Sequence, residues 1–329
     1  GAMTVLKIAI VFFVVIVGFF YVKASNFTPF IPPSQPASTV EGSSAVTGLM
    51  TQPLWQFATG MTPSVYGVPG ILSGAALVFF AFIGFDVVAT ASEETKNPHK
   101  NVPLGIGVGM LLIIVMYMLV AVVTTGMVSY ADLAKQDSPS LATAFELVGA
   151  DWAAKIISFG IVLGLATVVM VLLLGLTRIV FAMSRDGLLP RGLSKTGKHG
   201  TPAALQIVVG AVVALVAAFF DIGVLSDMVN IGTLSAFTLV AISIPIMRKK
   251  RPDLPRAFKM PGNPWIPILI AVANFWLMLN LSVLTWIRFV VWLVVGVAIY
   301  FGYGYWHARL GKGDLTETLS AETDKAVNG

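Results

Sequence analysis

Long apolar runs alternate with short polar segments along almost the whole chain. Each run has about 18 to 25 residues, the length that an α-helix needs to cross the hydrocarbon core of a bilayer. The pattern therefore predicts an all-α polytopic membrane protein with eight transmembrane helices. We expect them at residues 5–22, 70–91, 104–128, 155–183, 203–220, 226–247, 265–284 and 286–306.

The second apolar run, residues 70–91, contains its own interruption. Gly84 stands near its middle, with Asp86 two residues later. A glycine beside an aspartate at this depth weakens the helix and leaves backbone groups without partners, which hydrocarbon tolerates only where they line a cavity or are covered by protein. A broken transmembrane helix is typical of the binding site of a transporter.

Composition agrees with a membrane protein and argues against an enzyme. Hydrophobic residues make up 57% of the chain, charged residues make up 11%, and the mean hydropathy is +0.86, far from the balance of soluble domains. Cysteine is absent, which excludes disulfides and thiolate metal sites. His99, His199 and His307 lie far apart in loops or at a span end, which disfavours a metal site or a Ser-His-Asp triad. We expect no cofactor and no metal.

The basic residues are sorted between the two sides of the predicted membrane. Fifteen of the 21 lysines and arginines fall on one side, in segments 96–100, 185–198, 248–259 and 309–325, and at most four fall on the other. The positive-inside rule then places both termini in the cytoplasm and residues 23–69 outside. Because no basic-aromatic stripe accompanies the net charge of +5, we expect no nucleic-acid partner.

Two segments lie outside the predicted spans. Residues 23–69 contain seven prolines, so we expect an irregular linker or outer cap with one short surface helix at residues 54–59. The tail after Gly311 mixes charges of both signs with few apolar residues, and we expect it to be disordered.

Small residues recur at four-residue spacing in two of the predicted spans. Gly105 and Gly109 form one pair, and Gly160 and Gly164 form the other. This spacing is typical of close packing between transmembrane helices. The first pair precedes a helix without following a strand, so we interpret it as a packing feature and not as a nucleotide-binding loop.

Lys7 is an ionisable residue about one turn inside the first span. A lysine in hydrocarbon indicates a functional role by default, and if it faces the interior of the helix bundle it could accept and release a proton in each cycle. The alternative is that its ammonium group reaches the cytoplasmic headgroups. The sequence alone leaves both alternatives open.

Asp86 also has two interpretations. It is either a cap for the second half of the broken helix or a charged gate residue. With the second span running from outside to inside, the outer half-helix ends in the carbonyls of Phe80, Ala81 and Ile83 at mid-membrane. A row of carbonyls at a helix C-terminus suits an ammonium group.

Four motifs stand in order along nearly the whole chain: FFAFIGFD at residues 79–86, EETKNP at 93–98, TR at 177–178 with AMSRDGLLP at 182–190, and NIGTL at 230–234. They resemble those of the cationic amino acid transporter branch of the amino acid-polyamine-organocation superfamily. The resemblance implies a LeuT-like inverted-repeat transporter fold, here with the family's first four helices missing. The start at Gly1-Ala2-Met3 suggests a fragment, a processed product or residues left from cloning.

The resemblance also implies a division of the chain. Residues 1–22 correspond to the last helix of the first repeat, residues 23–69 to an extracellular loop, and residues 70–247 to the complete second five-helix repeat. Residues 264–308 correspond to two additional helices, and residues 309–329 to a cytoplasmic tail.

Site residues follow from the same resemblance. It implies that the backbone carbonyls of Phe80, Ala81 and Ile83 bind the substrate's α-ammonium group and that Phe79 and Phe82 form aromatic walls or a gate beside the Gly84 break. It places Thr167 and Met170 in the side-chain pocket, where a bulky uncharged Met170 favours small neutral amino acids over arginine. Lys7 matches a lysine that proton-coupled relatives carry where sodium-coupled ones bind an ion.

The expected function is therefore secondary active transport of L-amino acids across the plasma membrane, by proton-coupled symport. The expected partners are the amino acid, protons, membrane lipid and the missing helices one to four. One alternative is a truncated membrane fragment or scaffold that moves nothing, and the missing helices favour it for this chain taken alone. A membrane-embedded enzyme is disfavoured, because the spans lack paired carboxylates and clustered histidines.

Overall fold

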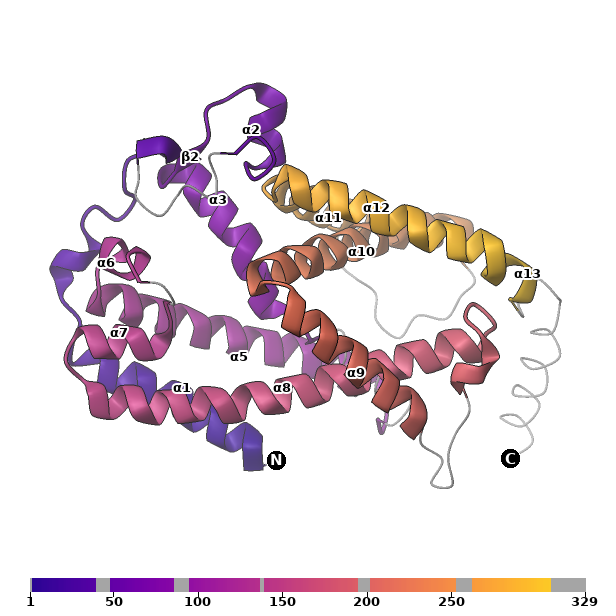
Figure 1. Cartoon of the computed structure of the whole chain (residues 1–329), viewed down its shortest axis with the longest axis horizontal. Helices are drawn as coiled ribbons and strands as arrows, with labels where there is room; N and C mark the ends of the chain where they lie inside the picture. The colour runs from indigo at the N-terminus through magenta and orange to yellow at the C-terminus, as the bar shows by residue number, and fades with distance from the viewer. Residues whose placement is uncertain are drawn as a thin grey trace. The chain divides into compact units, whose positions relative to one another are not determined.

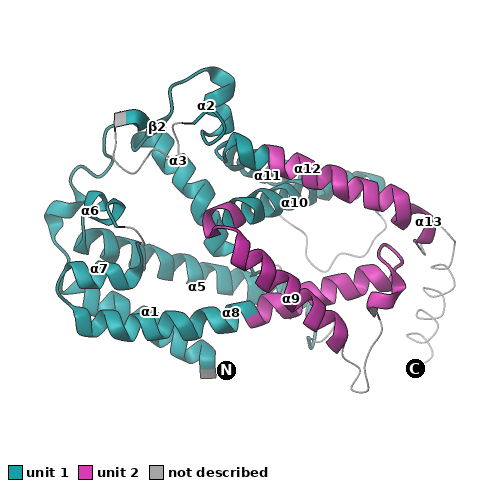
Figure 2. Cartoon of the chain, in the orientation of Figure 1, with its two compact units in different colours: residues 1–169, 226–286 teal, residues 170–225, 287–329 magenta. Residues whose placement is uncertain are grey.

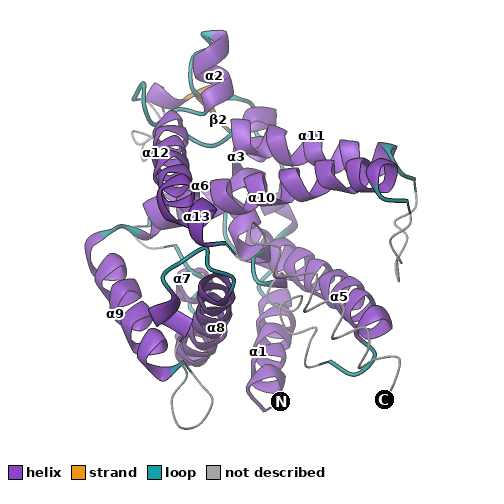
Figure 3. Ribbon diagram, turned by 90° about the vertical axis from the view of Figure 1, so that its right-hand side faces the viewer, coloured by secondary structure: helices purple, strands orange, loops and turns teal. Residues whose placement is uncertain are grey.

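A computed structural model of the chain describes residues 2–39, 48–85, 95–136, 139–194, 202–252 and 262–308 (Figure 1). These residues are helical almost throughout, and the short strands among them lie beside α2 (Figure 3). The apolar elements are α1 (Ala2–Phe19), α3 (Gly67–Val78), α5 (Pro98–Met127), α8 (Asp151–Arg185), α9 (Ala203–Phe219), α10 (Ile222–Lys250), α11 (Trp265–Leu279) and α12 (Val283–Ile299).

The helix lengths confirm part of the predicted membrane pattern. In the described residues, four helical stretches are long and apolar enough to cross a membrane: Lys100–Met127, Asp151–Arg185, Ile222–Lys250 and Val283–His307. Four shorter apolar helices overlap the remaining predicted spans, at Met3–Phe19, Gly67–Phe82, Ala203–Phe219 and Trp265–Leu279. Part of the predicted span 70–91 and the tail predicted to be disordered lie outside the described residues.

The chain divides into two compact units (Figure 2). The first comprises residues 1–169 and 226–286, and the second comprises residues 170–225 and 287–329. Helices α8, α10 and α12 each cross a boundary between the units.

The first unit has an apolar core where α1, α5, α7 (Leu141–Leu147) and the start of α8 pack together. Phe145 of α7 and Ile157 of α8 are almost fully buried in it, beside Val14 of α1 and Val123 of α5. Gly18 lets α1 approach this core, because a Cβ there would meet Val123, Met127 and Phe145. The core thus fixes α1, α5 and α8 against one another.

The segment between α1 and α3 is tied down at both ends. The backbone N–H of Lys23 and the Asn26 side chain both donate to the Gly126 carbonyl, each at 2.8 Å. Its far part carries α2 (Leu54–Thr59), which confirms the predicted surface helix. There Leu54 donates to the Leu281 carbonyl at 3.0 Å, and Leu284 donates to the Met50 carbonyl at 2.8 Å.

Short elements complete this segment. Strands β1 (Gln35–Pro36) and β2 (Ser64–Val65) pair antiparallel. The segment also contains the 3₁₀ turns η1 (Ala24–Phe27) and η2 (Ala37–Thr39). Elsewhere, the 3₁₀ turns η4 (Phe79–Phe82) and η6 (Arg191–Ser194) follow α3 and α8, and the short helix α6 (Tyr130–Ala134) precedes α7. The π-helical turn η7 (Tyr300–Gly304) and the short helix α13 (Tyr305–His307) follow α12.

In the second unit, the turn after α8 lies against the end of α13. Gly187 has φ = 82°, and a Cβ there would meet the His307 backbone, so this position requires glycine. The Ser184 hydroxyl donates to the Pro190 carbonyl at 2.7 Å and closes the turn. The AMSRDGLLP motif therefore contains the last turn of α8 and a tight turn that is held by its own hydrogen bonds.

Candidate functional site

The interruption predicted within residues 70–91 is confirmed. Helix α3 ends at Val78 and continues as the 3₁₀ turn η4 (Phe79–Phe82). Ile83 is then extended, with φ = −70° and ψ = 140°, and Gly84 has φ = 122°. Residues 79–84 form what we call the broken segment. Only glycine adopts such a φ without strain, which explains Gly84 at its end.

Helix α10 packs along this interruption. The ring of Phe237 lies 6.1 Å from that of Phe79, the first residue of the broken segment, and 5.3 Å from that of Phe85, which follows its last residue. Two turns earlier, the fully buried Asn230 donates from Nδ2 to the Leu77 carbonyl at 3.3 Å. Because Asn230 and Phe237 are seven residues apart, they share one face of α10, and this face braces both ends of the break.

Helix α5 braces the broken segment through Tyr117. The hydroxyl of Tyr117 donates to the Ala81 carbonyl at 2.8 Å, and its ring lies 5.1 Å from that of Phe82. The Phe80 carbonyl accepts from the Ile83 N–H at 3.2 Å. A carbonyl oxygen has two lone pairs, so the carbonyls of Phe80 and Ala81 retain the capacity to accept a hydrogen bond from a ligand.

Lys7 lies on the face of α1 that is directed at α8. A Cβ placed on Gly164 would be 4.0 Å from the Lys7 Cε, and one placed on Gly160 would collide with Ile10. This contact supports the packing role predicted for the glycines of α8. Within the described residues, Cβ atoms on Gly105 and Gly109 of α5 would meet nothing within 4 Å.

The remaining predicted site residues have different surroundings. Thr167 follows Gly164 on α8, and its hydroxyl donates to the Gly164 carbonyl at 2.8 Å. Met170 lies one turn further along the same helix, in the stretch that belongs to the second unit, and is 64% exposed. Asp86 lies outside the described residues, and its two interpretations stay predictions.

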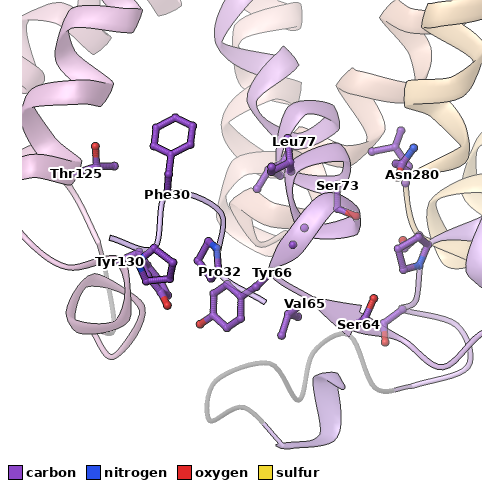
Figure 4. Close-up of a pocket in the computed structure, with 18 of the residues that line it drawn as sticks. Phe30, Pro32, Ser64, Val65, Tyr66, Ser73, Leu77, Thr125, Tyr130 and Asn280 are labelled. Carbon is purple, nitrogen blue, oxygen red and sulfur yellow. The ribbon is translucent and has the colours of Figure 1, made fainter. Parts of the chain in front are cut away.

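A cavity of about 680 Å³ opens along the first half of α3. We call it the α3 cavity. Figure 4 shows Ser73 and Leu77 of α3 between Thr125 and Tyr130 on one side and Asn280 on the other. The lining ends on α3 at Leu77, two residues before the broken segment. None of the predicted binding residues is among the described lining residues.

Tyr66 and Gly67 turn the chain into α3 with strained geometry. Tyr66 has φ = 62° and ψ = −175°, and Gly67 has φ = 59°. A non-glycine residue in this region costs about 1–3 kcal/mol and is retained where the surroundings enforce it. A Cβ on Gly67 would lie 3.0 Å from that of Ser34. The turn directs the Tyr66 ring to within 5.2 Å of the Tyr130 ring.

Sequence reasoning missed the residues that brace the break and line the cavity. Tyr117 and Asp227 could have been singled out from the sequence, because each places a polar group within an apolar span. Asn230 belonged to a recognised motif but received no role. Phe237 gave no signal, since a phenylalanine in an apolar helix is ordinary.

Long apolar helices, one of which passes into a 3₁₀ turn at Phe79 within its apolar stretch, are typical of polytopic membrane proteins that transport small solutes. Comparison with protein families matches residues 2–304 to the family described as "Amino acid permease". The chain therefore belongs to the amino acid permease family of the amino acid-polyamine-organocation superfamily. This confirms the resemblance drawn from the motifs and places the chain in a family of transporters, not of enzymes.

Individual relatives agree with this membership. The chain is 42% identical over 311 residues to the branched-chain amino acid permease BcaP of Bacillus subtilis (strain 168), a match that covers 94% of this chain and 60% of that protein. It is 39% identical over 313 residues to the methylthioribose transporter of the same bacterium, covering 95% and 60%. It is 45% identical over 195 residues to the mitochondrial cationic amino acid transporter 3 of Arabidopsis thaliana, covering 59% and 31%.

The chain thus spans about 60% of the length of the two bacterial relatives. Family membership implies the LeuT-like fold, and the described helices supply several of its apolar elements.

Proposed function

We propose that the full-length gene product is a secondary active transporter that moves L-amino acids across the plasma membrane by alternating access. The observation that carries this proposal is the broken segment after α3, where the chain leaves the α-conformation within an apolar stretch. Membership of the amino acid permease family supports it. The positive-inside bias of the loops supports cytoplasmic termini and an outward-facing α3 cavity.

In this proposal the ammonium group of the substrate binds the carbonyls of Phe80, Ala81 and Ile83. The C-terminal end of a helix carries partial negative charge, and α3 ends immediately before these residues. Phe79 and Phe82 form the aromatic walls, and Gly84 supplies the φ that lets the backbone turn away from helix.

We further propose that the preferred substrates are neutral amino acids with aliphatic side chains. We assign Met170 and Thr167 to the side-chain pocket, and because Met170 is bulky and uncharged, a guanidinium group gains no partner from it. The name of the branched-chain amino acid permease, which is 42% identical to this chain, supports the same choice.

Lys7 is the proposed site of proton coupling. Its stem lies at Gly164 of α8, so the ammonium is directed at a neighbouring helix of the first unit. Release of its proton would remove a charge from that contact and allow α1 and α8 to separate during the cycle. Headgroup contact is the competing role.

Reconstitution of the full-length product into liposomes tests amino acid transport and its proposed coupling to protons through Lys7. We expect leucine to accumulate when an inward proton gradient is imposed. Lys7→Ala should abolish this accumulation, whereas Lys23→Ala, which removes a lysine beyond the end of α1, should leave it near wild type. Gradient-driven uptake by Lys7→Ala at near wild-type magnitude would place the proton site elsewhere. Absence of leucine uptake by the wild type would favour the non-transporting scaffold.

A further inference from the structure

We propose that the second half of α10 binds an anionic phospholipid of the cytoplasmic leaflet. The inference goes beyond amino acid transport and does not depend on it. It rests on an exposed apolar stripe of α10 and on two lysines at the end of this stripe. These residues, which we call the α10 lipid face, are Leu239, Ile242, Ile246, Lys249 and Lys250.

Helix α10 has two faces with different surroundings. Asn230 and Phe237 lie on the face that braces the broken segment, whereas Leu239, Ile242 and Ile246 are exposed. Successive residues of an α-helix turn by about 100°, so these three lie about 140–200° around α10 from Phe237. The face opposite the broken segment is therefore apolar and exposed.

Two ammonium groups lie at the end of the exposed stripe. Lys249 and Lys250 are about 120° and 220° around the helix from Phe237, so they flank the line of the stripe. Both are exposed, and neither forms an ion pair within the described part of the chain. Arg248 and Arg251, on either side, each have an interaction of their own, so the proposal rests on the two lysines.

The length of the stripe fits one leaflet of a bilayer. From Leu239 to Lys249 the helix advances about 15 Å, at about 1.5 Å per residue. This is half of the hydrocarbon core, which is about 30 Å thick. The positive-inside bias places the end of α10 in the cytoplasm, where the leaflet carries anionic lipids that attract basic side chains. A lipid whose acyl chain follows the stripe therefore brings its phosphate to Lys249 and Lys250.

The helix dipole gives these lysines a competing role. Cations near the C-terminal end of a helix are stabilised by the partial negative charge there, and this requires no lipid. The two roles differ in what they select. The dipole is indifferent to the lipid, whereas the α10 lipid face selects a negatively charged headgroup that carries acyl chains.

The test is a titration of the solubilised full-length product with phosphatidylglycerol, followed by native mass spectrometry. We expect bound phosphatidylglycerol that neither phosphatidylcholine with the same chains replaces nor glycerol 3-phosphate displaces. Combining Lys249→Gln with Lys250→Gln should weaken this binding about thirtyfold, since each lysine contributes about fivefold near an anionic surface. Combining Lys249→Arg with Lys250→Arg keeps both charges and should retain it.

The matched control combines Lys312→Gln with Lys325→Gln. It removes the same charge from the same predicted side of the membrane but outside α10, and it should bind phosphatidylglycerol like wild type. Equal losses of affinity in the two glutamine variants would mean that the attraction is not localised at α10 and would overturn the site. Equal binding of both phospholipids, or displacement by glycerol 3-phosphate, would also overturn it.

Thermal unfolding separates lost lipid binding from a lost contact with the helix dipole. Phosphatidylglycerol should raise the unfolding temperature of the wild type and not that of the variant with glutamine at positions 249 and 250. Without the lipid, the two proteins should unfold at the same temperature. A loss of stability in the variant that is equal with and without phosphatidylglycerol would assign the lysines to the dipole alone and overturn the proposal.

Discussion

Glycines lie within a continuous helix in α8, whereas a glycine follows the point where the chain leaves the α-conformation after α3. Helix α8 continues for 35 residues through Gly160 and Gly164, whereas α3 leaves the α-conformation at Phe79, five residues before Gly84. The glycines of α8 lie in an uninterrupted ladder, and at Gly160 the missing side chain admits Ile10 of α1. A glycine therefore permits either packing or a break, and neighbouring residues decide which one occurs.

The neighbours of α3 supply what a broken helix needs. Tyr117 and Asn230 donate to carbonyls near the break, and Phe237 contacts aromatic rings at the two ends of the broken segment. Each hydrogen bond contributes about 0.5–1.5 kcal/mol. In the proposed mechanism, α3 offers backbone groups to the ammonium that all amino acids share, and α8 offers side chains to the part that differs between them.

Replacing the glycine of the break should have the largest effect. Gly84→Ala places a Cβ at φ = 122° in otherwise open space, so its cost of about 1–3 kcal/mol is conformational and not steric. We expect initial uptake rates of every substrate to fall by about tenfold or more in proteoliposomes. Gly74→Ala, in the helical part of α3 with open space around it, should transport like wild type. Equal rates in both variants would contradict a required break.

Shortening the proposed specificity residue should change the ranking of substrates and not the overall rate. Met170→Ser removes bulk and adds a hydroxyl, so competition by arginine relative to leucine should increase by about tenfold, within the 1–3 kcal/mol that such contacts supply. Val171→Ser is the control, because the next residue points about 100° around the helix. An unchanged ratio in Met170→Ser would remove Met170 from the pocket.

Removing the hydrogen bond between Tyr117 and the broken segment should have the smallest effect on transport. Tyr117→Phe keeps the ring beside Phe82 and deletes the hydrogen bond to the Ala81 carbonyl, at a cost of about 1 kcal/mol. We expect the KM for leucine to rise about fivefold with the protein folded, whereas Tyr300→Phe, in η7 after α12, should leave it unchanged. A KM for Tyr117→Phe that equals that of wild type would mean that α5 does not support the break.

Local features of the fold were predictable from the sequence. The apolar runs mark the helices because hydrocarbon requires continuous apolar length, and Gly84 marks the break because of its backbone freedom. The short helix at Leu54–Thr59 also followed from its setting among prolines. The residue ranges of α9 and α10 agree with the predicted spans within four residues at each end.

Contacts between distant residues were not predictable. Tyr117 and Ala81 are 36 residues apart, and Asn230 and Leu77 are 153 apart. Hydrophobic pattern gives the buried face of a helix but not its partner. The sequence left open whether the Lys7 side chain faces a neighbouring helix or the headgroups, because the pattern does not identify the helix that packs against α1. In the structure, α1 packs on α8 and the Lys7 side chain lies at Gly164. The positive φ of Tyr66 contradicts the preference of tyrosine and carries no sequence signal.

An experimental structure of the full-length product with leucine bound would test the proposed ammonium site at the broken segment directly. We predict that the leucine ammonium nitrogen lies about 2.7–3.2 Å from carbonyl oxygens of Phe80, Ala81 and Ile83. Leucine bound with its ammonium away from these carbonyls, or a helix that is continuous from Gly67 through Gly84, would contradict it.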